Sequence, residues 1–530
     1  MTNLKIWLKP LLILVGISLG VFGLLRGIDF LLVRGNLHPF AILFSNDIGN
    51  LTNTLGGLGE VVTAVLGIEI TVIAIVVQLA ANKYSSKIMD LFVSDRFNVS
   101  VISLYVITAI NTVLVVNTVN EKSLNLFSVT MTILLIILSL LFVIPHFNYI
   151  FRFLNPDNFL KHVSNRAIET LHKISDRKIG ETVSDEKNGI DKFSIKTEKQ
   201  KVKSDIDFIG DIALNAVFQG DRAVTLLCLT SLREILNSYY YIKPALPDEW
   251  YLITESEKSD PDFSSYSEFV LRNIEKDRVY LERKILSLYE VIFNNSKIKL
   301  RDVASGVLLN TQLITKEAIT VEDKGSIDNC IKYFNSYLRA SIRDKDPRSA
   351  FNTLEHYRII AEDILDKYPE RAATISRHFK YYGQEANKNQ VLFILETAAH
   401  DLCRINQVAY EKQAANLEEL LDIFLTVDEP AEGSEKEVKS KEASLIGVRI
   451  AQVKLAGFYL LHKEETLARK IYEDMRVEPL DRIKKIESII YSTEQEEFWE
   501  VTPRGVNFYY IDKEVREALR PFFTWFEKKV

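Results

Sequence analysis

Four long apolar runs dominate the first part of the chain. They cover about residues 7–33, 61–81, 99–119 and 126–144, and polar or turn residues bound each of them. A helix needs about 20 residues to cross about 30 Å of hydrocarbon at about 1.5 Å per residue. We therefore predict four membrane-spanning helices in a transmembrane domain of residues 1–154.

The pattern changes beyond this domain, where apolar positions recur at helical spacing between polar ones. Residues 155–300 are predicted to form a membrane-proximal helical domain, with a polar loop over 176–204. Residues 301–530 are predicted to form helical hairpins stacked as a solenoid or bundle, with a disordered loop at 429–442. Within them, 444–480 is similar to one tetratricopeptide unit, and an ordinary hairpin is the alternative. The predicted fold class is all-α.

Charge separates the same two parts of the chain. Residues 1–150 carry 15 of the 136 charged side chains (65 Lys and Arg, 71 Asp and Glu). The net charge is −6 and the two signs are interspersed, which argues against nucleic acid as a partner. The three cysteines show neither Cys-x-x-Cys spacing nor paired histidines, so we expect core thiols of a reducing compartment: Cys228, Cys330 and Cys403.

Basic residues near the spans predict the orientation. Lys and Arg are concentrated at the N-terminus, in the second loop and after the fourth span, whereas the other two loops carry only Arg34 and Lys122. By the positive-inside rule, both termini are cytoplasmic. The expected partners are the lipid bilayer and further copies of the chain, with a protein partner of the cytoplasmic part as a further hypothesis.

A glycine stripe runs along the first span at intervals of four, three and four residues. Glycines at this spacing share one helical face and let another helix backbone approach closely. We interpret the stripe as a packing face, and scattered glycines are the alternative. The residues are Gly16, Gly20, Gly23 and Gly27.

A polar stripe marks the second span, and a weaker one marks the third. At about 100° per residue the polar side chains of the second span fall on one face. Such stripes are costly against lipid, so they either form dry hydrogen bonds between helices or line a wet path. The candidates are Glu60, Thr63, Thr71, Gln78 and Asn82, with Asn111 in the third span.

Glu69 is a separate case, because it lies half a turn away from this stripe among apolar residues. An ionisable group inside the bilayer is expensive and is a candidate functional site. The alternative is a protonated carboxyl group that is hydrogen-bonded to a neighbouring helix. No Lys or Arg at a similar depth is available in this chain as its partner.

Signatures of catalysis are missing from the sequence. Phosphate-loop, metalloprotease, serine-hydrolase and kinase motifs are absent, and Gly56-Gly57-Leu58-Gly59 opens a predicted membrane helix rather than a nucleotide domain. His400-Asp401 is a lone dipeptide without further metal ligands one turn away. We expect structural roles for the histidines, no enzymatic activity, and no catalytic, cofactor-binding or metal-binding residues.

The segment after the second span resembles a bacterial family of predicted membrane proteins, domain of unknown function 2254. The resemblance covers residues 60–150 and is partial beyond, where Asp211-Ile212-Ala213 and Gly220-Asp221 follow the family pattern without its prolines. It implies a multi-pass protein of the bacterial cytoplasmic (inner) membrane, and no residue roles. The residues that carry it are Gln78 to Asn82, Tyr84, Ser85, Lys87, Asp95 and Arg96.

Two functional hypotheses follow from the sequence. In the first, the spans assemble into a homo-oligomeric channel-like or transport-like complex, and the helical cytoplasmic domain gates it. In the second, the spans only anchor a helical scaffold or sensor that binds a protein partner and has no conduction path. The transported ion or solute, the number of copies and the partner cannot be identified from the sequence.

Overall fold

The computed structural model describes residues 2–34, 48–93, 95–119, 125–180, 188–259, 263–429 and 445–527. The described segments are helical apart from turns and one isolated bridge between Glu497 and Val506, which confirms the all-α prediction. The chain divides into two compact units, residues 1–162 and 163–530, which are described separately below. Residues 430–442 of the predicted disordered loop lie outside the described ranges.

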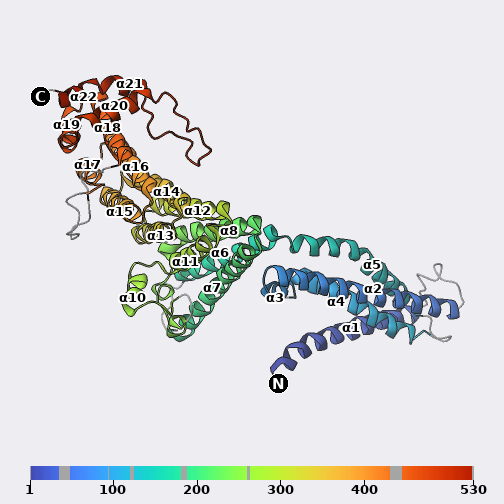
Figure 1. Ribbon diagram of the computed structural model, residues 1–530. Coiled ribbons are helices and arrows are strands. Elements are labelled where there is room, and N and C mark those ends of the chain that lie inside the picture. The colour runs from blue at the N-terminus through green and yellow to red at the C-terminus, as the bar shows by residue number, and fades with distance from the viewer. Residues whose placement is uncertain are drawn as a thin grey trace. The chain divides into compact units, whose positions relative to one another are not determined.

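The first unit contains the four predicted spans. They are α1 (Thr2–Arg34), α2 (Ile48–Lys83), α4 (Arg96–Val116) and α5 (Leu126–Phe153), and each is long and apolar enough to cross a membrane. The short helix α3 (Lys87–Val93) connects α2 to α4. Helices α4 and α5 pack against each other and against both α1 and α2 (Figure 1). Many large apolar side chains point outward from this bundle, as is typical of a surface that faces lipid.

Two helix boundaries differ from the prediction. Helix α2 begins at Ile48 rather than near residue 61, so the Gly56–Gly59 segment lies inside the helix. Helix α5 continues through Pro145 to Phe153 instead of ending near residue 144. A proline removes one backbone hydrogen bond, but the turns after it are buried at His146 and Ile150, and this packing maintains the helix.

Three apolar clusters form the core of this unit along the length of α2. The first joins Leu51 and Leu55 to Val115 and Val129. The second surrounds Val62 and includes Val101, Tyr105 and Ile136. The third surrounds Ile73 and Val77 and includes Phe92 and Ile150. A buried polar group located between two such clusters is separated from water on both sides.

The second unit is built from helical hairpins in two layers. In each layer a helix contacts the helix before it and the helix after it, and the two helices of a hairpin lie in different layers (Figure 1). This is the solenoid arrangement that the repeating hairpin pattern predicts. One layer contains α8 (Arg222–Ile242), α12 (Arg301–Thr320), α14 (Pro347–Ile364), α16 (Leu392–Glu411) and α18 (Ile446–Leu461); the other contains α7 (Asn188–Gln219), α11 (Tyr280–Ser296), α13 (Lys324–Arg343), α15 (Pro369–Lys388) and α17 (Leu417–Leu425).

Similar turns connect these hairpins. A residue with positive φ follows a helix, as at Glu322 (60°) and Lys345 (52°), and an aspartate then caps the next helix. Asp323 accepts a hydrogen bond from the backbone N–H of Ser326, and Asp346 accepts one from Ser349. An N-cap aspartate contributes about 0.5–2 kcal/mol. The turns therefore have a local sequence signal that does not depend on glycine.

The predicted loop over residues 176–204 is wrong for much of its length. Helix α6 (Pro156–Gly180) and helix α7, which starts at Asn188, cover most of it. The segment appears polar because its buried face includes lysines. Lys199 is buried, donates a hydrogen bond to the backbone carbonyl of Leu252 and pairs with Glu257 at 3.0 Å. Lys203 is also buried, and Val202 beside it is fully buried.

Short helices complete the two ends of the second unit. The aromatic residues at the C-terminus pack partly within the chain, since Phe522 and Phe526 contact Tyr472 in the helix Glu465–Met475. Trp499 is exposed and stacks only on Phe498 among its aromatic neighbours in the described segments. These helices are α9 (Glu255–Lys258), α10 (Glu268–Lys276), α19 (Glu465–Met475), α20 (Leu480–Ser492), α21 (Lys513–Ala518) and α22 (Arg520–Glu527).

Candidate functional site

A buried polar face extends along helix α5. Ser128, Thr132, Ser139 and His146 follow one another at intervals of four, seven and seven residues, and all four are buried. Eighteen residues from first to last correspond to roughly 27 Å of helix, close to the thickness of a bilayer core. We call these four residues and their hydrogen-bond partners the polar seam.

At one end of the seam, Asp29 of α1 binds the first turn of α5. Its carboxylate accepts hydrogen bonds from the backbone N–H groups of Phe127 and Ser128, each at 3.0 Å, and from the Ser128 hydroxyl. A carboxylate at this position satisfies free N–H groups and is stabilised by the helix dipole. This contact fixes α1 against α5.

In the middle of the seam, α4 and α5 share two side-chain hydrogen bonds. Asn111 Nδ2 donates to Thr132 Oγ1 at 2.9 Å, and the hydroxyls of Thr108 and Ser139 are 3.0 Å apart. Asn111 is fully buried. It therefore makes a dry contact between helices, which is one of the two roles expected for the polar stripes.

At the other end, His146 connects three helices. Its Nδ1 lies 2.6 Å from Glu69 Oε1 on α2, and its Nε2 lies 3.0 Å from Asn98 Oδ1 on α4. All three side chains are buried. Glu69 thus has a histidine partner, whereas the sequence analysis considered only Lys and Arg and found neither at a similar depth. The neighbouring-helix hydrogen bond weighed for Glu69 is present.

Asn98 fixes the number of protons in this group. Its Nδ2 donates to the backbone carbonyl of Phe92 at 3.1 Å, so Oδ1 is the atom that faces His146. Since Oδ1 can only accept, His146 Nε2 must carry a hydrogen. Nδ1 is then either an acceptor facing a protonated Glu69 or a donor facing an ionised one. In both states one proton lies between Nδ1 and Oε1.

Apolar side chains enclose the pair along the bundle. The cluster around Val62 lies toward one side of Glu69 in α2, and the cluster around Ile73 lies toward the other. The hydroxyl of Tyr105 interacts electrostatically with Glu69. Tyr105 Oη and Glu69 Oε2 form no hydrogen bond of good geometry with any other group in the described ranges, so their contact with each other is the polar contact available to them there. Buried polar atoms without partners are rare, and they often mark functional positions or bound water.

The predicted polar stripe of α2 faces away from the bundle. Thr63 and Thr71 only donate to the backbone carbonyls of Gly59 and Gly67 one turn earlier. The stripe therefore lines no interior path within one copy of the chain, and Asn111 is not part of the same surface. Its exposed members are Glu60, Thr63, Thr71, Gln78 and Asn82.

The glycine stripe of α1 also faces outward. Gly16, Gly20, Gly23 and Gly27 are exposed, and a Cβ atom built at any of them meets no other described heavy atom within 4 Å. Within one copy of the chain, the stripe does not form a close helix contact in the described part of the unit. Its role as a packing face remains a prediction about a second copy.

Sequence reasoning did not identify His146 and Asn98. A signal was available, because His146 interrupts an apolar span immediately after Pro145. The hydrophobic pattern shows which residues share a face of one helix. It does not show which faces of separate helices meet, and the pairing of Glu69 with His146 joins positions 77 residues apart.

Comparisons with known proteins support the membrane assignment and extend it. No curated protein and no solved structure matches the chain. The resemblance noted for residues 60–150 is confirmed over a longer range, which includes all four spans, α6 and most of α7. Residues 3–210 match the family described as predicted membrane protein (DUF2254), whose function is unknown.

Proposed function

We propose that this protein is a homo-oligomeric, transport-like assembly of the bacterial inner membrane in which Glu69 and His146 form a proton-binding site. The second unit is then a regulatory domain on the cytoplasmic side, together with both termini. The proposal includes no catalytic reaction and no cofactor. The observation that carries it is the 2.6 Å contact between Glu69 Oε1 and His146 Nδ1, enclosed by apolar side chains.

The chemistry of the pair supports proton binding. A carboxyl group and an imidazole are the two side chains that most commonly accept and release protons in proteins, and here they are in direct contact. Chains of Asp, Glu and His inside membrane helices form the proton relays of pumps and transporters. Glu69 Oε2, which faces the Tyr105 hydroxyl without a hydrogen bond of good geometry, offers an acceptor for an incoming proton.

The outward stripes support assembly with further copies. Glu60 and Gln78 are exposed on a helix whose other side is packed, and polar side chains are costly against lipid. A second copy can cover them and hydrogen-bond to them. The open glycine stripe of α1 provides a second surface suited to close helix contact.

The alternative is a membrane-anchored scaffold or sensor without a conduction path. The hydrogen bonds along the middle of the seam favour it, because Asn111–Thr132 and Thr108–Ser139 join α4 directly to α5. In this case the Glu69–His146 pair only holds α2 against α5.

Proton flux into liposomes tests the proposal. The full-length chain is reconstituted with a pH-sensitive dye inside, and a potassium gradient with valinomycin sets the membrane potential. We expect flux above that of protein-free liposomes, and a loss of at least tenfold in Glu69→Gln and His146→Gln. Wild-type flux equal to that of protein-free liposomes would refute the proposal and leave the scaffold alternative.

Two matched variants control for the substitutions. His162→Gln changes an exposed histidine outside the spans and should retain wild-type flux. Glu60→Gln changes an exposed carboxyl group on α2 and should also retain it if protons use the pair. If Glu60→Gln abolishes flux while Glu69→Gln does not, the path follows the outward stripe between copies, and the assignment to the pair is wrong.

A further inference from the structure

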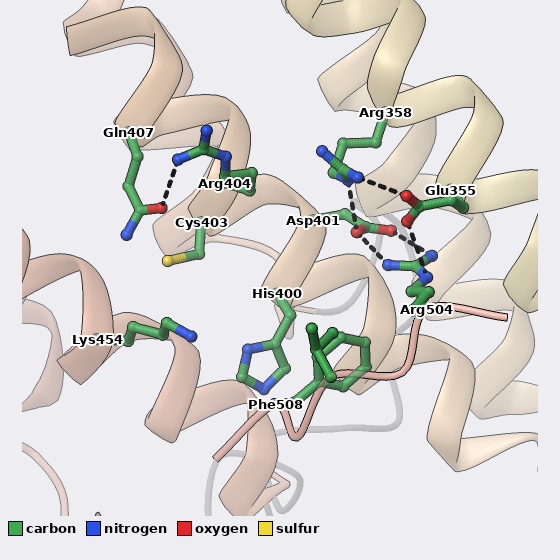
Figure 2. A pocket seen from close by; sticks show the side chains of 11 residues that line it. Glu355, Arg358, His400, Asp401, Cys403, Arg404, Gln407, Lys454, Arg504 and Phe508 are labelled. Atoms are coloured by element: carbon green, nitrogen blue, oxygen red, sulfur yellow. Dashed lines mark hydrogen bonds and ion pairs between the residues drawn. The ribbon is translucent and has the colours of Figure 1, made fainter. Parts of the chain in front are cut away.

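A cavity in the second unit has the features of a ligand site. It has a volume of about 260 Å³ and lies among α14, α16, α18 and the segment that contains Arg504 and Phe508 (Figure 2). A second cavity of about 750 Å³ shares three of its lining residues, Arg404, Gln407 and Lys454. The two cavities adjoin at these side chains.

The charges around the cavity divide into two groups. On one side, Arg358 and Arg504 are neutralised. Asp401 forms two hydrogen bonds with Arg504, at 2.5 and 3.0 Å, and Glu355 pairs with Arg358 at 2.7 Å (Figure 2). These four side chains connect α14, α16 and the segment after α20. Their two positive and two negative charges balance, so this side of the cavity does not attract an anion.

On the other side, two cations lack close carboxylate partners. Lys454 Nζ donates to the backbone carbonyl of Tyr510 at 3.0 Å and has no carboxylate within 4.0 Å in the described part of the chain. Arg404 approaches the carboxylate of Glu411 only to 3.7 Å and Gln407 Oε1 only to 3.5 Å. Both side chains line both cavities.

His400 provides a separate indication of a ligand. Its ring is more than nine-tenths buried and stacks on Phe508 with centroids 4.6 Å apart. Its Nε2 has no hydrogen-bond partner within the described residues. Figure 2 shows Lys454 extending from the facing helix toward this ring. A buried polar atom without a partner is unfavourable, so a bound group that hydrogen-bonds to it is stabilised.

The protonation states suit an anion. Burial, with Lys454 and Arg504 nearby, lowers the pKa of His400 well below its usual value, so the imidazole is neutral and offers one donor and one acceptor. Burial raises the pKa of the Cys403 thiol to about 12, so this residue adds no negative charge. Arg404 is then paired loosely, with Glu411 at 3.7 Å, and Lys454 has no carboxylate within 4.0 Å in the described ranges, although the adjoining cavity also contains Asp512 and Glu514 in its lining.

We infer that this cavity binds a small organic anion through a phosphate or carboxylate group, with Arg404 and Lys454 contacting the oxyanion and His400 hydrogen-bonding to the bound molecule. Arginine forms paired hydrogen bonds to such groups, and lysine adds a point charge. Since Arg404 lies on α16 and Lys454 on α18, the ligand bridges two successive helices of one layer. The site is independent of the membrane pair.

Thermal unfolding of the full-length protein in detergent tests the site. The probes are inorganic phosphate and succinate, each compared with sodium chloride at equal ionic strength. We expect a saturable rise in the unfolding temperature with at least one probe. A response to phosphate alone indicates a phosphate compound, and a response to succinate alone indicates a carboxylate. No saturable rise with either probe would overturn the inference.

Two variants and one control complete the test. Arg404→Gln and Lys454→Met should each weaken the apparent affinity for the probe at least tenfold. Lys388→Met, which changes an exposed lysine on α15, should leave it unchanged. Arg404 is about half exposed, so its replacement preserves the fold even if Lys454→Met does not. Equal responses of Arg404→Gln and the wild type would show that the anion acts elsewhere.

Discussion

The imidazole of His146 and the carboxyl group of Glu69 meet at 2.6 Å inside a bundle of apolar helices. Neither group is exposed to solvent, and each is the closest polar partner that the structure gives the other. Removing one of them leaves a buried polar or charged group without its partner, whereas removing both eliminates that mismatch and leaves only weaker polar neighbours, Asn98 Oδ1 and Tyr105 Oη, beside the space. The interaction energy between the two side chains can therefore be measured by comparing single and double variants.

A double-mutant cycle on the pair is the first prediction. Glu69→Leu or His146→Leu alone should destabilise the first unit by roughly 3 kcal/mol, because each leaves the other group buried and unpaired. The double variant should be more stable than the sum of the two effects implies, by at least 1 kcal/mol. Chemical unfolding in mixed micelles measures these energies. Strictly additive effects would show that the two groups do not interact.

The second prediction concerns the outward face of α2. Cysteines at Thr63, Thr71 and Gln78 should react with a water-soluble thiol reagent if a wet path runs between copies, whereas cysteines at the buried Val62 and Val77 should not. The native cysteines are buried and give a low background. Unreactive cysteines at all five positions would place the stripe in lipid or in a dry interface.

A third prediction uses the glycine stripe of α1. Gly20→Ile and Gly23→Ile should fold as well as the wild type, since the space beside both glycines is open within the chain. They should nevertheless weaken association between copies, because the added side chain separates the two backbones. Mass photometry in detergent measures the fraction of oligomer. Val33→Ile, at an exposed position of the same helix away from the stripe, is the control.

The fourth prediction concerns a buried ion cluster in the second unit. Lys243 Nζ lies 2.6 Å from Glu282 Oε1 and 2.5 Å from Asp323 Oδ2, and Glu282 is fully buried. Lys243→Met should cost about 3–5 kcal/mol, because it leaves the Glu282 carboxyl group buried without its partner. Lys388→Met, at an exposed pair, should cost less than about 1 kcal/mol. Urea unfolding followed by circular dichroism compares the two variants.

The fifth prediction is that His356 and His378 weaken the second unit in acid. Burial lowers the pKa of His356 from 6.5 to about 4, and it also lowers the pKa of His378. At these two residues the unfolded chain binds more protons than the folded one between about pH 6.5 and pH 4, so their contribution to stability falls as the pH falls through this range. Burial raises the pKa of carboxyl groups such as Glu290 and Glu362, which act in the opposite sense, so the comparison with a histidine variant isolates the histidine contribution. His356 alone should account for roughly 1–2 kcal/mol at pH 5. The free energy of unfolding at pH 7.5 and pH 5 tests this, and His356→Gln should reduce the difference.

Sequence patterns predicted those features that depend on one helix at a time. The four spans and the helical hairpins follow from apolar runs and from the period of 3.6 residues. The helix over residues 188–204 was missed because its buried face contains Lys199 and Lys203, which no single-helix pattern distinguishes from solvated lysines. An ion pair to a distant segment is what makes such a lysine a core residue.

The candidate sites were harder to predict because they are formed where helices meet. Glu69 was identified as unusual by its own surroundings, but its partner was not, since His146 is on another span. Similarly, the dipeptide His400-Asp401 has no significance along its own helix. It becomes part of a site only because α14, α18 and the segment around Arg504 come together beside it.

The layered hairpins of the second unit determine how this part of the protein loses its structure. Among the described helices, α14 packs on its neighbours in the stack, and the segment after α20 also reaches it, where Arg504 donates to the backbone carbonyl of Phe351 and pairs with Glu355. Loss of the C-terminal end therefore breaks these contacts to α14 as well, whereas the hairpins farther from that end keep their own contacts. The unit should consequently unravel in steps from an end under mechanical load, and it should store elastic energy as small rotations distributed over many interfaces.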